Sequence, residues 1–189
     1  MYGCPFAQAS VKGMISKIMS PPNFPVMFED IRADIVYNEA CEEPFAIKSM
    51  LISPIPLSHP NQGVGYKFTE EGKSFVFLTD NELTFKHPGG ADFQEYRDFS
   101  AGADLLVHDA EFTEEEYNKK TKTWGHSIYR DALRLALDAG AKRFGLFHHN
   151  QERSDEGLDE IVADCRRIVK AKGKELECFA VQQGLEISL

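Results

Sequence analysis

Apolar residues recur at helical spacing near the start of the chain. Residues 8–19 place Val11, Met14, Ile15 and Ile18 on one side of a helix. The stretch SPPNFP follows at once, and proline cannot continue a helix. The pattern therefore predicts one amphipathic helix that ends before this proline-rich stretch.

Helical spacing returns near the end of the chain, after Ser154, a residue suited to capping a helix N-terminus. Acidic residues fill the first turn, lysines lie in the last turn, and Gly173 follows. A shorter helix is expected over 128–139, with Ser127 as its cap and Gly140 at its end. The one apolar face of the longer helix contains Leu158, Ile161, Val162, Cys165, Ile168 and Val169.

Short apolar runs predict strands between these helices. GVGYKFTEEGKSFVFLTD predicts a hairpin with strands at 65–69 and 74–79 around a Glu-Glu-Gly turn. ADLLVHD and FGLFHHN predict buried strands, and ELECFAVQQGLEISL predicts one or two more. A short strand is expected at 35–37, and FAIKSMLISPIPL is read as a strand that runs into a loop. Strands alternating with helices predict an α/β layered fold whose sheet is covered on both sides.

Composition places the chain among ordinary soluble domains. Its 189 residues suit one domain, and 42% are hydrophobic and 27% charged. A net charge of −9 gives no general attraction to nucleic acid or anionic membranes. Cys4, Cys41, Cys165 and Cys178 form no C-x-x-C pair, so we expect reduced thiols in a cytoplasmic protein. No long apolar stretch or secretory signal is present, and no membrane partner is expected.

Histidine or aspartate closes each of the predicted central segments. The residues in question are His59, Asp80, His108, Asp109, His148 and His149. Because ligand sites in α/β folds gather at strand ends, we expect these side chains to share one rim of the sheet. Imidazole nitrogen and carboxylate oxygen form the ligand mix that zinc accepts, and a carboxylate can bridge two ions. The pattern therefore predicts a metal site.

Each candidate also has a structural alternative. His59 lies in a loop sequence, SHPN, and Asp80 in TDNE has the setting of a turn residue. Asp109 could accept hydrogen bonds from the following backbone, and His126 in WGHS could be a packing contact. His87 in KHPGG has only loop context and is expected to be structural.

The motifs PLSHPNQGVGYKF, FVFLTDNE, ADLLVHDAEF, GHS and LFHHN follow one another along the chain. In this order they resemble the metallo-β-lactamase superfamily, and most of all its ribonuclease Z-like and phosphodiesterase-like branch. The resemblance covers nearly the whole chain and implies a single domain over residues 1–189. It also implies an αββα sandwich with a dinuclear metal site at one edge.

The resemblance implies roles for six residues. His59, Asp80 and His148 resemble metal ligands, with Asp80 bridging two ions, and His149 is expected behind the metal position. The implied reaction is hydrolysis of a phosphodiester or similar ester by a metal-activated water. The remaining two residues resemble a proton-relay pair, which protonates the leaving oxygen: Asp109 and His126.

The chain departs from the family pattern in one respect. The signature His-x-His-x-Asp-His, which supplies most ligands in the family, does not occur, and all six histidines lie after residue 58. The chain therefore resembles the C-terminal major part of the fold, N-terminally incomplete. Three ligands shared by two positions predict weak or absent metal binding. Missing strands predict an exposed sheet edge through which a homo-oligomer could form.

Two hypotheses follow. The first is a metal-dependent hydrolase with a divalent cation, zinc being expected first and manganese or iron being alternatives. The second is a non-catalytic or truncated remnant of the fold that acts as a structural or interaction module. The acidic charge, and the lack of the Gly-rich arm of transfer RNA-processing enzymes, favour a small phosphodiester or ester substrate over nucleic acid.

Overall fold

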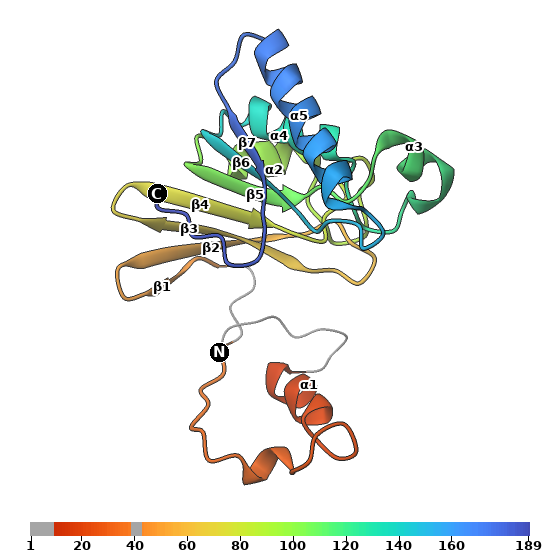
Figure 1. Cartoon of the computed structure of the whole chain (residues 1–189). Helices are drawn as coiled ribbons and strands as arrows, with labels where there is room; N and C mark the ends of the chain where they lie inside the picture. The colour runs from red at the N-terminus through yellow and green to blue at the C-terminus, as the bar shows by residue number, and fades with distance from the viewer. Residues whose placement is uncertain (1–9, 39–42) are drawn as a thin grey trace. The chain divides into compact units, whose positions relative to one another are not determined.

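The computed structural model of the chain describes residues 10–38 and 43–189 (Figure 1). The chain divides into two compact units, Met1–Pro44 and Phe45–Leu189. Each unit is built from its own elements, and the second contains all the candidate site residues.

The first unit contains the predicted N-terminal helix. Helix α1 spans Val11–Ile18, and the Ser10 hydroxyl accepts a hydrogen bond from the Gly13 amide at 3.1 Å. A 3₁₀ turn, η1, follows at Phe28–Asp30. The prediction of a strand at 35–37 is wrong, because this segment is irregular, with Val36 66% exposed. The predicted helix start at residues 8 and 9 lies outside the described residues.

The second unit is built on one seven-stranded sheet whose strands lie side by side in sequence order. The first four strands pair antiparallel and the last four pair parallel, with the fourth belonging to both sets. The predicted hairpin and the two buried strands are confirmed, whereas FAIKSMLISPIPL forms a hairpin of its own. The strands are β1 (Phe45–Ile47), β2 (Met50–Pro56), β3 (Val64–Glu70), β4 (Lys73–Leu78), β5 (Leu105–Asp109), β6 (Arg143–Phe147) and β7 (Glu177–Ala180).

Helices connect the parallel strands, which confirms the mixed α/β fold class. Helices follow each of the first three parallel strands, and the three longest of these helices lie together on one side of the sheet (Figure 1). A surface helix was expected in the charged segment after β5. This segment forms a short helix and one π-helical stretch. The elements are α2 (Phe93–Phe99), α3 (Glu114–Glu116), η2 (Tyr117–Thr121), α4 (Tyr129–Asp138) and α5 (Asp155–Ala171).

The two predicted helix caps have different outcomes. Ser154 caps α5 as predicted, because its hydroxyl accepts a hydrogen bond from the Gly157 amide at 3.2 Å. Ser127 does not cap α4, whose N-cap residue Ile128 makes no side-chain cap. The Ser127 hydroxyl instead donates to the carbonyl of Asn81 at 2.6 Å, so tertiary contacts determine its role.

The core lies between the sheet and its three helices. Val76, Leu106, Phe144 and Cys178 are paired in register across the four parallel strands and are almost fully buried on this face. The opposite face carries a row of half-buried aromatic rings, in which neighbouring ring centroids lie 5.4 to 6.1 Å apart: Phe68, Phe75, Phe77 and Phe147. Among the described residues, the helices therefore cover one face of this sheet.

Two further expectations concern the chain as a whole. Cys165 and Cys178 are free, buried thiols, and burial raises the pKa of Cys165 to about 12; Cys4 and Cys41 lie outside the described residues. Among the residues that the structure describes, no helix has the length and apolar character needed to cross a membrane. The parallel strands place their C-terminal ends at one edge of the sheet, and the candidate residues gather there.

Candidate functional site

The candidate site begins where β4 and β6 end. Asp80 lies two residues after β4, and His148 directly follows β6. Both residues have a left-handed backbone, with φ of 56° and 55°. This conformation is uncommon for residues other than glycine and is concentrated at functional sites. The two side chains meet, with His148 Nε2 3.4 Å from Asp80 Oδ1.

Asp109 and His126 form a tight pair beside these residues. Asp109 is the last residue of β5 and its side chain is fully buried, with Oδ2 2.7 Å from His126 Nδ1. Its Oδ1 accepts from the amides of Ser127 and Glu111, each at 3.2 Å. Burial alone would lower the pKa of His126, but the hydrogen bond to Asp109 and the nearby carboxylate charges outweigh it and raise this pKa. The carboxylate therefore holds the Nδ1–H form of the ring.

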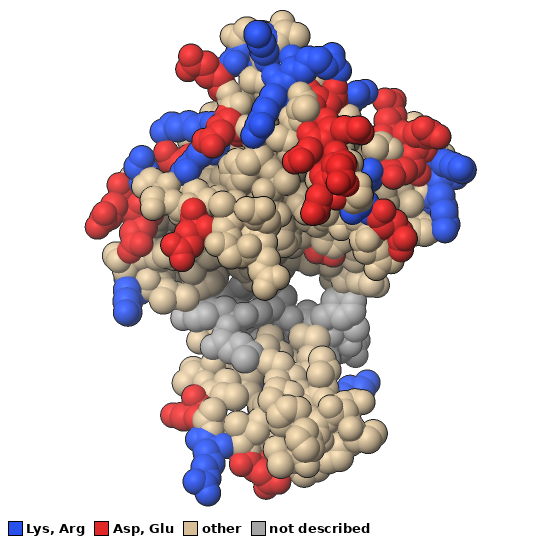
Figure 2. All heavy atoms as spheres, viewed as in Figure 1, with Lys and Arg blue, Asp and Glu red and all other residues tan. Residues whose placement is uncertain are grey.

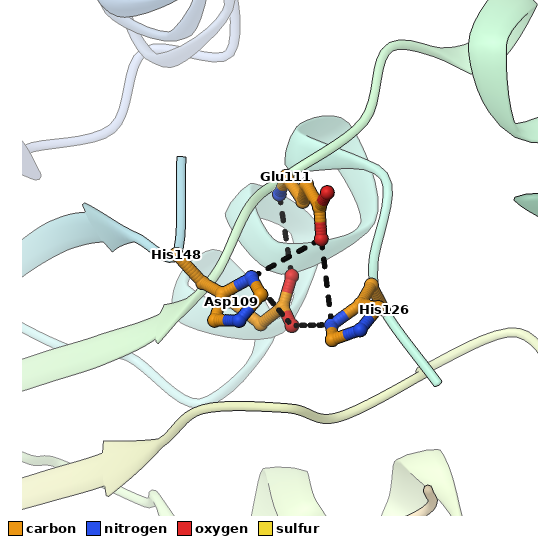
Figure 3. Close-up of side chains that lie close together, drawn as sticks. All are labelled: Asp109, Glu111, His126 and His148. Carbon is orange, nitrogen blue, oxygen red and sulfur yellow. Dashed lines mark hydrogen bonds and ion pairs between the residues drawn. The ribbon is translucent and has the colours of Figure 1, made fainter. Parts of the chain in front are cut away.

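Glu111 is a site residue that the sequence reasoning missed. Its Oε2 lies 3.1 Å from His148 Nδ1 and 3.5 Å from His126 Nδ1 (Figure 3). The hydrogen bond to Glu111, strengthened by the charges of Asp109 and Asp80, raises the pKa of His148 to about 9. The available signal was spacing, since residues two apart in extended chain project to the same side and Glu111 follows Asp109 by two.

The imidazoles of His126 and His148 lie nearly parallel, with ring centroids 4.5 Å apart and an interplanar angle of 14°. Figure 3 shows both rings turned toward the carboxylates of Asp109 and Glu111. The Nδ1 atoms of both rings contact these carboxylates, and the other nitrogen of His148, Nε2, lies 3.4 Å from Asp80 Oδ1.

His59 approaches the same place from the loop after β2. Its ring meets that of His126 edge to face, with centroids 5.4 Å apart. Burial first, and then the neighbouring His126, lowers the pKa of His59, which favours the neutral imidazole that ligates metals. Gly125 makes room for this ring, since a Cβ atom there would lie 2.1 Å from His59 Cδ2.

Two overlapping sets of donor atoms result. One nitrogen or oxygen from each of His59, Asp80 and His126 lies within 4.8 Å of the others. A second set with the same spacing contains Asp109, Glu111, His126 and His148. The Asp80–His148 contact joins the two sets, so all five predicted residues gather at one edge of the sheet. Imidazole and carboxylate donors at this spacing fit a divalent cation.

Asn81 fixes the segments that carry these residues. Its amide nitrogen donates to His108 Nε2 at 3.0 Å, and its side-chain oxygen accepts from the Ser58 amide at 2.9 Å. Its carbonyl accepts from the Ser127 hydroxyl at 2.6 Å. A single buried asparagine therefore sets the positions of three separate segments. The three partners are direct sequence neighbours of three site residues, His59, Asp109 and His126.

His108 does not reach the rim of the site. It is completely buried, its Nδ1–H donates to the Asp109 carbonyl at 2.6 Å, and its Nε2 accepts from Asn81. Burial lowers the pKa of His108 and favours its neutral form. His149 bonds through Nε2 to the carbonyl of Val181 at 3.1 Å, so it fastens the chain after β7 and does not contact His148 through this nitrogen.

Glu82 is a second buried hub, and the sequence reasoning missed it. Its carboxylate accepts from the amides of Thr123 and Gly125, each at 2.8 Å, and from His87 Nε2 at 2.9 Å. The Tyr117 hydroxyl also donates to it. A buried carboxylate is costly without partners, so these four donors stabilise its charge. His87 is buried and structural in this arrangement, and the loop before His126 is fixed at two points.

The comparisons with known proteins concern the sequence and the fold of the chain. Residues 21–149 match the model of the β-lactamase superfamily domain. Ribonuclease Z of Brevibacillus brevis is 29% identical over 106 residues, which cover 54% of this chain and 30% of that protein. Ribonuclease Z of Thermoplasma volcanium is 34% identical over 96 residues, covering 51% and 28%. The chain thus spans less than a third of either curated relative.

The short form of human tRNase Z has a similar fold. The comparison gives a TM-score of 0.65 at 18% identity and covers 99% of this chain and 66% of that one. The expectation of a small ester in preference to nucleic acid is wrong, because the relatives are ribonucleases. The physical reason is that the net charge of a whole chain does not determine the charge of the surface around one site.

We predict that Glu111→Gln lowers the pKa of His148 well below its value of about 9, because the neutral amide removes the main stabilising charge. A folded-state pKa above the ordinary 6.5 means that this pair stabilises the protein fully below pH 6.5. That stabilisation is lost as the pH rises through about 9. An NMR titration of the histidine rings in metal-free protein measures the pKa of His148 in the wild type and in Glu111→Gln. The control is Glu115→Gln, on an exposed residue of α3, and an unchanged His148 titration in Glu111→Gln contradicts the assignment.

We also predict that Glu82→Gln lowers the free energy of unfolding by about 2 kcal/mol, because glutamine keeps one acceptor oxygen for four donors. Urea denaturation measures the loss. Fluorescence anisotropy of Trp124 should fall in the same variant, since Thr123 and Gly125 flank this residue. Glu175→Gln, at an exposed position, is the matched control. Equal unfolding midpoints for the two variants would show that Glu82 is not a hub.

Proposed function

The chain belongs to the β-lactamase superfamily, on its ribonuclease Z-like branch, and we propose that it is a metal-dependent phosphodiesterase that acts on RNA. The observation that carries the proposal is the meeting of three imidazoles and three carboxylates at the ends of the parallel strands. The names of the curated relatives support RNA as the substrate class.

In this proposal, the residues that would hold the metal are His59, Asp80 and His148. Asp80 offers an oxygen within 4.8 Å of a nitrogen of His59, and its Oδ1 lies 3.4 Å from His148 Nε2. Three protein ligands with an open position are typical of catalytic zinc sites, and manganese or iron accept the same donors. The cation supplies Lewis acidity toward a water nucleophile and toward the phosphoryl oxygen.

Asp109 and His126 supply the proton. The hydrogen bond at 2.7 Å engages His126 Nδ1, so Nε2 is the atom that faces the reaction. The raised pKa of His126 increases the fraction of protonated imidazole near neutral pH, as a general acid needs. As water adds to phosphorus and releases a proton to the solvent, the bond between phosphorus and the leaving ribose oxygen breaks. His126 Nε2 then gives its proton to that oxygen, and Asp109 stabilises the remaining Nδ1–H.

The metal prediction uses the whole chain, purified and loaded with zinc, manganese or iron in turn. Asp80→Ala and His148→Ala are expected to lose bound metal, measured by atomic emission, together with hydrolysis of bis(p-nitrophenyl) phosphate. Asp138→Ala, on the exposed side of α4, is the control and should retain both. A wild-type chain that neither retains metal nor hydrolyses either a phosphodiester or RNA would support the alternative of a non-catalytic module.

A second prediction isolates proton donation. His126→Asn is expected to slow cleavage of an RNA oligonucleotide by about 100-fold, because the ribose oxygen needs a proton as it leaves. The same variant should change hydrolysis of bis(p-nitrophenyl) phosphate far less, since p-nitrophenolate leaves without a proton. Parallel rate measurements on the two substrates test this difference. Equal losses on both would assign His126 to metal binding and remove it as the acid.

A further inference from the structure

A groove opens beside the candidate site. Its volume is about 790 Å³, within the range of small-molecule binding sites and large enough for a nucleotide. The end of β6 forms one side and the segment from η2 to residue 124 forms the other. The side chains that matter here are Lys119, Lys120 and Trp124 on one wall, and His148, His149 and Asn150 on the other.

Trp124 is the only tryptophan of the chain, and 48% of its surface is exposed. Its backbone is nevertheless fixed, because the amides of Thr123 and Gly125 on either side both donate to the buried carboxylate of Glu82. A large aromatic ring held in water by a rigid loop contributes little to the core. Such rings are the surfaces on which unpaired nucleic-acid bases stack.

Cationic side chains accompany the ring. Lys120 Nζ lies 5.4 Å from the centroid of the Trp124 ring, and Lys119, Lys120 and Lys122 are all exposed. Within the described part of the chain, the lysines that form ion pairs with carboxylates lie elsewhere, at positions 73, 86 and 142. The ammonium groups beside the ring are therefore available for phosphate oxygens. Figure 2 shows basic side chains projecting beside acidic ones at the right edge, over the α3–η2 segment.

The acidic residues of the groove are largely engaged. Glu116 pairs with Arg153 at 2.7 Å, and Glu111 pairs with His148 at 3.1 Å. Glu152 is the third glutamate of the groove, and it is exposed. The pairing of the first two lowers the repulsion that a phosphate would meet, although the whole chain has a net charge of −9.

We propose that this groove binds one unpaired nucleotide of a single-stranded RNA next to the bond that is cleaved. The base stacks on Trp124, while Lys119 and Lys120 pair with its phosphate. Because His148 lines the groove and contacts Asp80, the strand then leads directly to the candidate metal position. The stacking needs a base free of its duplex neighbours, so the site selects single strands. The inference rests on the proposed function and adds to it the place and form of the substrate.

The test measures binding without cleavage. Protein freed of metal by EDTA is titrated with a uridine hexanucleotide, and quenching of Trp124 fluorescence reports occupancy directly because no other tryptophan is present. Trp124→Ala, followed by anisotropy of a fluorescein-labelled hexanucleotide, is expected to weaken binding by roughly 10-fold or more, as the loss of one stacked base does. Trp124→Phe should retain most of the affinity, which separates stacking from damage to the loop.

A second experiment tests the role of the lysines. The double variant Lys119→Gln and Lys120→Gln should weaken binding and reduce the slope of log affinity against log salt by about 1.4, the value for two phosphate contacts on a single strand. The double variant Lys170→Gln and Lys172→Gln, at exposed positions at the end of α5, is the matched control and should leave the slope unchanged.

The outcomes distinguish this inference from the proposed function. Unchanged affinity in Trp124→Ala, or equal binding of a duplex RNA of the same length, overturns the groove whether or not the protein cleaves RNA. Quenching that saturates and is lost in the lysine variant supports the groove, even where the metal-loaded protein cleaves no RNA and the catalytic proposal fails.

Discussion

The organisation of this site depends on burying two polar residues, Asn81 and Glu82, in the loop that follows the core strand β4. Asp80 stays at the surface of the site, while Asn81 and Glu82 turn into the protein and are almost fully buried. Each is satisfied by partners from other segments, because a buried amide or carboxylate without hydrogen bonds would cost several kcal/mol. The chain segments around the site therefore cannot move independently without leaving one of these groups unpaired.

This constraint explains how loops can hold a reactive arrangement. Asn81 holds the neighbours of His59, Asp109 and His126, and Glu82 holds the backbone on both sides of Trp124. Loops carry much of the chemistry of proteins, but a loop positions a side chain well only when its backbone is fixed. Here Asp80 reaches the site, and the next two residues, Asn81 and Glu82, fix the loops that surround it.

Electrostatics at the sheet edge follow from the same placement. Three carboxylates lie close to three imidazoles, and the raised pKa of His148 shows the field that these carboxylates produce. A histidine must be neutral to bind a metal, so a divalent cation that binds here displaces protons from the histidines. Metal binding and proton release are therefore coupled. Lys119 and Lys120 line the groove together with Glu111 and His148 of this centre, so opposite charges face the same groove.

The sequence was informative where local patterns determine structure. Apolar runs located β4, β5 and β6, and their final residues located Asp80, Asp109 and His148. Ser154 was recognisable as a cap because its partner lies three residues away. Glu82 was not recognisable, because its amide partners lie 41 and 43 residues along the chain. The prediction that Ser127 caps a helix was wrong for the same reason, because its partner Asn81 is distant along the chain. The prediction of a small ester substrate was wrong because the net charge is a sum over the whole surface.

The central claim is that side chains from separate strand ends share one divalent cation. Anomalous diffraction from crystals grown with manganese or zinc measures this most directly. The account predicts a single strong peak in contact with Asp80 and His148, and within reach of His59, which disappears in Asp80→Ala crystals. A peak elsewhere on the protein, or none at this edge of the sheet at saturating metal, would contradict it.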